Sequence, residues 1–176
     1  ASLAPARRAK ALLEEMTLAE KVGQLNQRLY GFRIYERKCV NGEDTIELSE
    51  EFCQEVEKYS GLGVLYGLYR ADPWADKNYE TGLTGVLSKK AYNQVQRYVL
   101  EHSRLGIPVM MSSECPHGHQ ALDGYLLPVN LLAGATFDPA MVRAAYRVSG
   151  RQLQNMGVDL ALMSMLDVLR DPRWGR

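Results

Sequence analysis

The sequence of 176 residues has no long hydrophobic run and no net charge. Because a helix needs about 20 consecutive apolar residues to cross a bilayer, and no stretch approaches that length, we expect no membrane partner. Its 21 basic residues balance its 21 acidic residues, which gives no electrostatic attraction to nucleic acid. A hydrophobic content of 46% and a charged content of 24% indicate a globular chain with a core of its own.

Cysteine is also scarce. Cys39, Cys53 and Cys115 are widely spaced and include no CxxC pair, so they do not form a disulfide framework. The opening ASLAPARRAK has basic residues without the apolar centre of a secretory signal, although such a signal can be removed from a mature protein. We therefore predict a reducing compartment, the cytoplasm.

The first third of the chain shows local helix signals. Residues 5–16 have apolar side chains at helical spacing. Thr17 and Glu20 form a capping box, which predicts the start of a second helix. Ser49 is expected to cap a third helix over residues 50–59.

A turn signal lies between the second and third of these helices. Asn41-Gly42 favours a tight hairpin turn, with residues 33–40 and 44–48 as its arms. We assign residues 1–60 to an N-terminal helical lead-in that includes this possible hairpin.

The rest of the chain alternates apolar strands with amphipathic helices. We predict strands over residues 61–68, 107–112 and 158–166, with helices over 88–105 and 139–156 between them. Continuous apolar strands separated by helices are typical of a parallel α/β sheet, and ligands bind beyond the carboxyl ends of such strands.

These elements predict the fold class. Three strands are few for a closed eight-stranded barrel, which takes about 250 residues. We therefore interpret residues 61–176 as the first three β/α units of a partial TIM-type (β/α)8 barrel, an incomplete domain with an N-terminal helical extension.

A dense polar cluster follows the second predicted strand, in SSECPHGHQALDG. Cys115, His117 and His119 stand at alternate positions and are types that bind zinc. However, the intervening proline and glycine bend the segment, and no second ligand cluster accompanies it. We predict no metal and no cofactor.

Two other interpretations of this cluster concern Cys115 and Glu114. A Cys–His nucleophile is possible, but nothing marks Cys115 as activated, and a small apolar filler is the simpler role. Glu114 directly follows the strand, where a carboxylate can accept charge-assisted hydrogen bonds from ligand hydroxyls. It could equally form an ion pair with an arginine elsewhere in the fold, and the residues alone do not decide between the two.

The end of the chain, RDPRWGR, is the second dense polar stretch. An arginine here can fork onto a polyol or carboxylate, and a tryptophan face can stack on a sugar ring. A structural arginine–aspartate network is the alternative, and we expect both roles to be present. The residues concerned are Asp167, Arg170, Asp171, Arg173, Trp174 and Arg176.

Four segments together resemble a known family. MTLAEKVGQL, RLGIPVMMSSECPHGH, LAGATFDPAMV and GVDLALMSMLDVLRDPRWGR occur in this order. They are similar to the N-terminal barrel domain of glycoside hydrolase family 3, the β-glucosidases, β-xylosidases and related exo-acting enzymes. The resemblance covers most of residues 10–27 and 98–176.

The resemblance implies a retaining, cofactor-independent glycosidase that removes terminal non-reducing β-linked sugars through a covalent glycosyl-enzyme intermediate. In the family an Asp on a later barrel strand is the nucleophile, and a Glu from a following domain usually serves as acid/base. Neither motif occurs in these 176 residues. We therefore assign no catalytic residue to this chain and expect the chain alone to be inactive.

The resemblance also implies half of a sugar-binding subsite. Glu114 matches the acidic residue that holds hydroxyls of the terminal sugar, and Arg173 matches the arginine that binds the same sugar. His117 matches a residue that shapes its loop, while Asp167 and Trp174 resemble supporting residues.

The first loop and the partners complete the expectations. Tyr69, Arg70 and Trp74 follow the first strand and by position could border the aglycone side. The implied partners are a carbohydrate with terminal glucose or a xylose-like sugar, the remainder of the barrel and a following domain. The alternative is a non-catalytic half-barrel whose open hydrophobic edge makes it an assembly unit, possibly a homo-oligomer.

Overall fold

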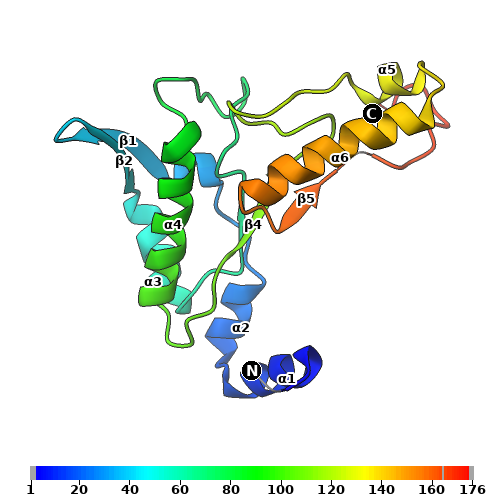
Figure 1. The fold of residues 1–176 in the computed structure, drawn as a ribbon. Helices are drawn as coiled ribbons and strands as arrows, with labels where there is room; N and C mark the ends of the chain where they lie inside the picture. Colours follow the sequence, from blue (N-terminus) through cyan, green and yellow to red (C-terminus); the bar gives the residue numbers. More distant parts are fainter. Residues whose placement is uncertain (1–2, 164, 175–176) are drawn as a thin grey trace.

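The computed structural model describes residues 3–163 and 165–174 of the chain, which form an α/β structure (Figure 1). Its helices are α1 (Pro5–Glu15), α2 (Leu18–Gln24), the 3-10 helix η1 (Gly31–Arg33), α3 (Glu50–Tyr59), α4 (Gly85–Glu101), α5 (Asn130–Gly134) and α6 (Pro139–Asn155). Its strands are β1 (Tyr35–Val40), β2 (Glu43–Leu48), β3 (Val64–Tyr66), β4 (Met110–Glu114) and β5 (Leu160–Leu162). None of the described helices is both long and apolar enough to cross a membrane.

The predicted parallel sheet is confirmed. Its strand order is β3-β4-β5, with Tyr66 opposite Ser112 and Glu114 opposite Leu162. Helices α4 and α6 form the two crossovers between successive strands (Figure 1). The observed strands are shorter than the apolar runs that predicted them, because β3 and β5 each pair with β4 over three residues.

Helices α2 and α3 start at the caps that the sequence predicts. Thr17 Oγ1 accepts from the Glu20 backbone N–H at 3.3 Å, and the Glu20 carboxylate accepts from the Thr17 backbone N–H at 2.7 Å. Ser49 caps α3, and the Asp138 carboxylate accepts two backbone N–H groups at the start of α6. These side chains satisfy donors that a helix leaves unpaired at its start. Helix α5 was not predicted from the sequence.

Strands β1 and β2 form an antiparallel hairpin. Asn41 and Gly42 at its turn have φ of 53° and 81°, which is the left-handed conformation that two-residue hairpin turns require. The hairpin packs against α4, where the Gln94 side-chain amide donates to the Ile46 carbonyl at 3.0 Å. The assignment of residues 1–60 to a separate lead-in stays a prediction.

The hydrophobic core lies between the sheet, α3 and α4. Phe52 and Val56 of α3, Leu65 of β3, and Val95 and Val99 of α4 are completely buried. The core therefore joins elements on both sides of residue 60, and it fixes β3 against the helices that cover it.

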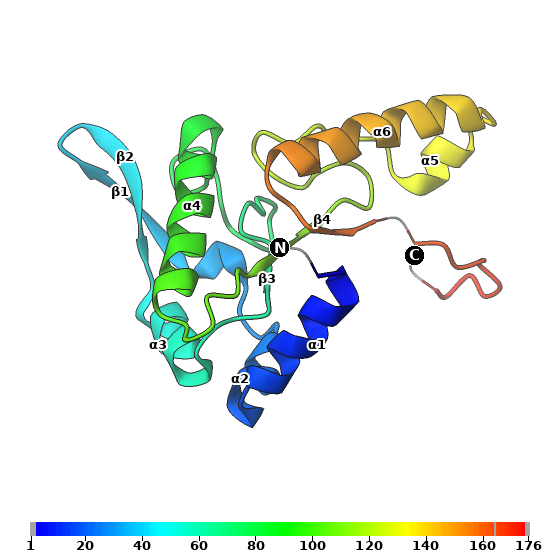
Figure 2. The ribbon, with the colours of Figure 1, turned by 60° about the horizontal axis from the view of Figure 1, so that its bottom comes forward.

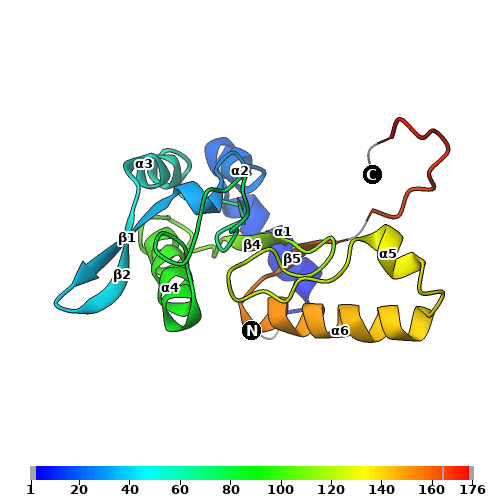
Figure 3. The same cartoon turned by 90° about the horizontal axis from the view of Figure 1, so that it is seen from above.

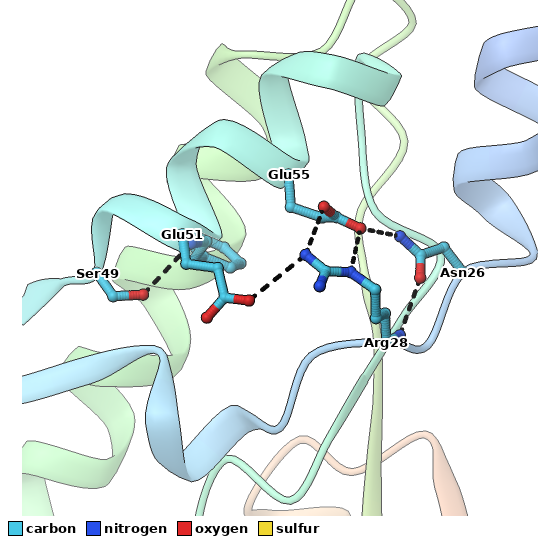
Figure 4. A network of polar contacts seen from close by, with 6 residues as sticks. Asn26, Arg28, Ser49, Glu51 and Glu55 are labelled. Carbon is cyan, nitrogen blue, oxygen red and sulfur yellow. Dashed lines mark hydrogen bonds and ion pairs between the residues drawn. The ribbon is translucent and has the colours of Figure 1, made fainter.

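A polar network supports the amino end of β3 (Figure 4). The Arg28 guanidinium donates to Glu55 Oε1 at 3.1 Å and to Oε2 at 2.9 Å, and it lies 3.4 Å from Glu51. The Asn26 side-chain amide donates to Glu55 Oε1 at 2.6 Å, and the Asn26 backbone carbonyl accepts from the Val64 N–H at 3.2 Å. The hydrogen bonds from Arg28 lower the pKa of Glu55 below its usual value, although burial opposes them. This network stabilises the amino end of β3, opposite the end that carries Tyr66.

Candidate functional site

The carboxyl ends of β3 and β4 bring Tyr66 and Glu114 together. Because Tyr66 lies opposite Ser112 and side chains alternate along a strand, Glu114 projects from the same face as Ser112, two residues further along. The Tyr66 hydroxyl donates a 2.7 Å hydrogen bond to Oε1 of Glu114. The sheet therefore presents one carboxylate at the edge where parallel sheets bind ligands.

A tight turn returns Arg70 to the same place. The Arg70 N–H donates to the Gly67 carbonyl at 3.1 Å, and Gly67 has a φ of 73°, which favours glycine. Arg70 Nη1 donates to the Tyr66 hydroxyl and lies 3.5 Å from Glu114 Oε1. Arg70, Tyr66 and Glu114 thus form one polar cluster.

Residues of the first loop hold Arg70. Arg70 Nε and Nη2 lie 2.8 and 2.6 Å from Oδ2 of Asp72, and the guanidinium carbon lies 4.5 Å from the ring centroid of Trp74. The Trp74 ring meets Tyr30 and Phe32 at 5.0 Å each and is about half exposed. Of the predicted first-loop residues, Arg70 therefore belongs to the cluster and Trp74 borders it.

Tyr69, the third of these first-loop residues, does not border the cluster. Tyr69 is buried, and its hydroxyl donates to the Met156 carbonyl at 2.6 Å. Its ring also packs edge-on against His119. The expectation that Tyr69 borders a ligand is wrong, because the turn after β3 points it toward the end of α6 and into the core.

The charged and polar side chains of the cluster shift one another's pKa values. Burial alone would raise the pKa of Asp72, but the hydrogen bond from Arg70 lowers it below its usual value. Burial, together with the adjacent Glu114, raises the pKa of Tyr66, so the hydroxyl stays a neutral donor. Burial opposes the charge on Arg70, but its hydrogen bond with Asp72 raises the pKa of the guanidinium above its usual value. One cation therefore lies between two carboxylates.

The two oxygens of Glu114 differ. Oε1 receives the Tyr66 hydroxyl and faces Arg70. Over residues 3–163 and 165–174, no hydrogen bond reaches Oε2, and the side chain is 27% exposed. The sequence left ligand binding and arginine pairing as alternatives, and the geometry allows both at once.

Cys115 and His119, in the loop after β4, are not placed for catalysis. Cys115 is completely buried, and burial raises the pKa of its thiol, so it is not an activated nucleophile. His119 is also buried, with Nε2 3.0 Å from the Ser113 hydroxyl, and burial lowers its pKa to about 4. His119 is therefore a neutral core residue at neutral pH.

His117 lies between these two residues and is partly buried. Its carbonyl accepts from the Leu127 N–H at 2.8 Å, which ties the start of the loop to its end. A role in shaping the loop stays a prediction. Within the described ranges, no group of three or more His, Cys, Asp or Glu side chains could hold a metal ion.

The last segment of the chain, which follows β5, does not reach the polar cluster around Glu114. Arg173 is 89% exposed, and its guanidinium pairs with Asp171 two residues away. In Figures 2 and 3 this segment lies beyond β5, on the side away from β4. The structure therefore does not bring Arg173 to Glu114, because the segment folds on itself instead of packing on the sheet.

The supporting residues of the same segment are also exposed. Asp167 and Arg170 lie on its surface, and the Trp174 ring is about half exposed. Arg176 lies outside the described residues. The predicted roles of Asp167 and Trp174 stay predictions.

Comparison with known proteins shows the family of the chain. The family described as Glycosyl hydrolase family 3 N terminal domain matches residues 17–176. The chain belongs to this family. The resemblance noted from its sequence motifs is therefore confirmed.

Named relatives of this family 3 chain are much longer than it is. A putative beta-xylosidase of Formosa agariphila is 30% identical over 176 residues, which cover 100% of the chain and 21% of the relative. A periplasmic beta-glucosidase of Salmonella typhimurium is 27% identical over 94% of the chain and 17% of the relative. Beta-glucosidase C of Emericella nidulans is 26% identical over 96% of the chain and 25% of the relative. The chain thus spans a quarter or less of each.

Sequence reasoning missed part of the site in this family 3 domain. Tyr66 was interpreted only as part of an apolar strand, and Asp72 was not singled out. A signal was available for Tyr66, because a hydroxyl-bearing ring at the carboxyl end of a buried strand faces the ligand edge. No spacing rule indicates that Arg70 turns back onto that ring.

Proposed function

We propose that this chain supplies half of the sugar-binding subsite of a retaining, exo-acting β-glycosidase. The enzyme would hydrolyse terminal non-reducing β-linked sugars, such as glucose or a xylose-like sugar. The observation that carries the proposal is the Glu114 carboxylate at the end of β4, with Oε1 held by Tyr66 and Oε2 open. The names of the relatives, beta-xylosidase and beta-glucosidase, support the same substrate class.

The chemistry of Glu114 suits sugar hydroxyls. An ionised carboxylate only accepts hydrogen bonds, and a bond from a hydroxyl to it is roughly twice as strong as a bond between neutral groups. In glycoside hydrolysis, hydrogen bonds to ring hydroxyls strengthen as the sugar approaches its oxocarbenium-like transition state. Glu114 would therefore contribute to kcat as well as to binding.

The sheet is proposed to be the first part of a (β/α)8 barrel that the remainder of a longer polypeptide completes. Large apolar side chains on β5 and the segment after it support this, because Leu160 and Leu162 are partly exposed, and Leu166 and Val168 are 92% and 81% exposed. Exposed apolar surface of this extent marks an interface. Packing of later strands against β5 would reorient the last segment and allow Arg173 to approach the sugar held by Glu114.

Catalysis itself is assigned to other parts of the longer polypeptide. The nucleophile and the acid/base would be two carboxylates about 5 Å apart, as retaining glycosidases require, and neither is assigned to this chain. The partners are then a carbohydrate, the rest of the barrel and a following domain, with no cofactor. A cytoplasmic location stays a prediction.

The same apolar surface favours a second candidate, in which this chain is a non-catalytic half-barrel that assembles with another copy. In both candidates β5 and the segment that follows it are covered, either by the rest of the barrel or by another copy of the chain. They differ in whether the longer polypeptide turns over a glycoside.

The test uses the full-length polypeptide that contains this chain, with aryl β-glucosides and aryl β-xylosides as substrates. We expect turnover of at least one of them, and a loss of about 100-fold or more in kcat/KM for Glu114→Ala and for Arg173→Ala. Arg147→Ala, at an exposed arginine of α6, is the matched control and should leave kcat/KM unchanged. Near-wild-type activity of both site variants would exclude the subsite.

A further inference from the structure

We propose that Arg70 is a positioning residue for Glu114. Acting through Tyr66 and its own charge, it fixes Oε1 of the carboxylate so that Oε2 faces the sugar. This inference rests on the proposed function of Glu114. It adds to that function the device that orients the carboxylate and that distinguishes its two oxygens.

The contacts form a directed relay. Arg70 Nη1 donates to the Tyr66 hydroxyl oxygen, which leaves the hydroxyl proton for Glu114. That proton makes the 2.7 Å bond to Oε1, and Nη1 itself lies 3.5 Å from the same oxygen. Any movement that turned the carboxylate away from Tyr66 or withdrew it from β3 would break these interactions. Charge-assisted hydrogen bonds are the strong ones, so this orientation is well defined.

Arg70 is able to impose an orientation because it is itself fixed. Its side chain is only 15% exposed, Asp72 binds it through Nε and Nη2, and the Trp74 ring covers its guanidinium. Its backbone pairs with Ala121, and the neighbouring Ala71 N–H donates to the Gln120 carbonyl at 3.2 Å. The loop after β3 is therefore attached to the loop after β4, which begins directly after Glu114.

Two other roles fit Arg70 less well. Binding of an anionic ligand is disfavoured, because the two carboxylates of Asp72 and Glu114 already exceed the single positive charge of Arg70. A purely structural role would not require the relay to end on one oxygen of a partly exposed carboxylate. The Arg28–Glu55 pair shows that contrast, since Arg28 contacts both oxygens of a buried glutamate at the opposite end of β3.

The experiment is a double-mutant cycle in the full-length polypeptide, measured on whichever aryl β-glycoside the wild type turns over fastest. The variants are Arg70→Lys, Glu114→Gln and the pair combined. Lysine keeps the charge but lacks the planar fork that reaches Asp72 and Tyr66 together. We expect Arg70→Lys to lower kcat and kcat/KM about 10- to 100-fold, and to change them less than about twofold when Glu114 is already glutamine.

Two controls separate positioning from folding. Arg28→Lys, in the ion pair at the other end of β3, should leave kcat/KM near the wild-type value while it lowers Tm. Tyr66→Phe removes only the hydroxyl of the relay, and we expect about a tenfold loss of kcat/KM that again disappears in the Glu114→Gln background. Tyr66→Phe decides the question if Arg70→Lys does not fold.

The outcomes are distinguishable. If the fold-losses in kcat/KM of Arg70→Lys and Glu114→Gln multiply in the double variant, the two residues act independently and the positioning role is overturned. A large loss in Glu114→Gln would still leave the proposed function standing. Wild-type activity in Glu114→Gln would overturn both. Wild-type activity in Arg70→Lys and Tyr66→Phe, with a large loss in Glu114→Gln, would overturn only the positioning role.

Discussion

The Tyr66 hydroxyl holds one oxygen of the Glu114 carboxylate at 2.7 Å and leaves the other open. The two residues end neighbouring parallel strands, so the backbone of the sheet sets their separation. A site placed on strands is held more precisely than one placed on flexible loops.

This relationship predicts a penalty for shortening Glu114. Glu114→Asp keeps the charge but withdraws the carboxylate by one methylene from Tyr66 and Arg70. We expect kcat/KM on an aryl β-glycoside to fall about tenfold or more, because a displacement of about 1 Å in such a site costs up to 100-fold. The same change at Glu101, the exposed last residue of α4, should have no effect. Equal activity of Glu114→Asp and the wild type would show that the reach of this side chain is unimportant.

The second prediction concerns the close approach of α2 to β3. A methyl group on Gly63 would lie 1.9 Å from the Gln24 carbonyl oxygen. We therefore expect Gly63→Ala to lower the free energy of unfolding by about 1–3 kcal/mol or more, as overpacking does. Urea denaturation followed by circular dichroism measures this.

Gly134→Ala is the matched control for that experiment. No heavy atom lies within 4 Å of its added methyl group, and alanine favours a helix over glycine by about 0.5–1 kcal/mol. It should leave stability unchanged or raise it slightly. If the two variants unfold at the same urea concentration, the packing of α2 against β3 is not as described.

Local signals predicted most of the secondary structure. The capping box at Thr17 and the Ser49 cap each depend on residues close in sequence, and so does the turn at Asn41-Gly42. The continuous apolar strands likewise predicted a parallel sheet. Strand ends were less predictable, because they depend on the register between strands that are distant in sequence.

The site was predicted only in part, for the same reason. Glu114 could be selected because it follows an apolar strand and matches a family motif. The relay from Arg70 through Tyr66 depends on the register of β3 against β4 and on the turn at Gly67. The position of Arg173 depends on packing beyond β5, which no local pattern in RDPRWGR encodes.

The third prediction concerns pH and the ion pair between Glu20 of α2 and Arg104, which follows α4. Arg104 donates hydrogen bonds of 2.8 Å to each oxygen of Glu20. These bonds, with that from the Thr17 backbone, lower the pKa of Glu20 from 4.5 to about 2. Because the folded state prefers the ionised form, the stabilisation is complete above about pH 4.5 and is lost as the pH falls toward 2.

Glu20→Gln should therefore lower stability at pH 7 and flatten its decline between pH 4.5 and 2. The free energy of unfolding in urea, measured at several pH values, tests this. Glu14→Gln, at an exposed pair with Lys10, should leave the acid limb unchanged. An acid limb that is equally steep in Glu20→Gln and the wild type would refute the assignment.

The fourth prediction concerns the 176-residue chain expressed alone. We expect no turnover of aryl β-glucosides or β-xylosides, because the nucleophile and acid/base are assigned to other parts of the enzyme. We also expect self-association in sedimentation velocity, driven by exposed side chains such as Leu166 and Val168. Measurable turnover by the purified chain would contradict the first expectation, and a monomer at high concentration the second.

The most direct measurement of the central claim is a crystal structure of the full-length polypeptide with its terminal sugar bound. The account predicts a sugar hydroxyl within about 2.5–3.0 Å of Glu114 Oε2, with Oε1 still bonded to Tyr66. A sugar that binds elsewhere, or that leaves Oε2 without a hydroxyl partner, would contradict it.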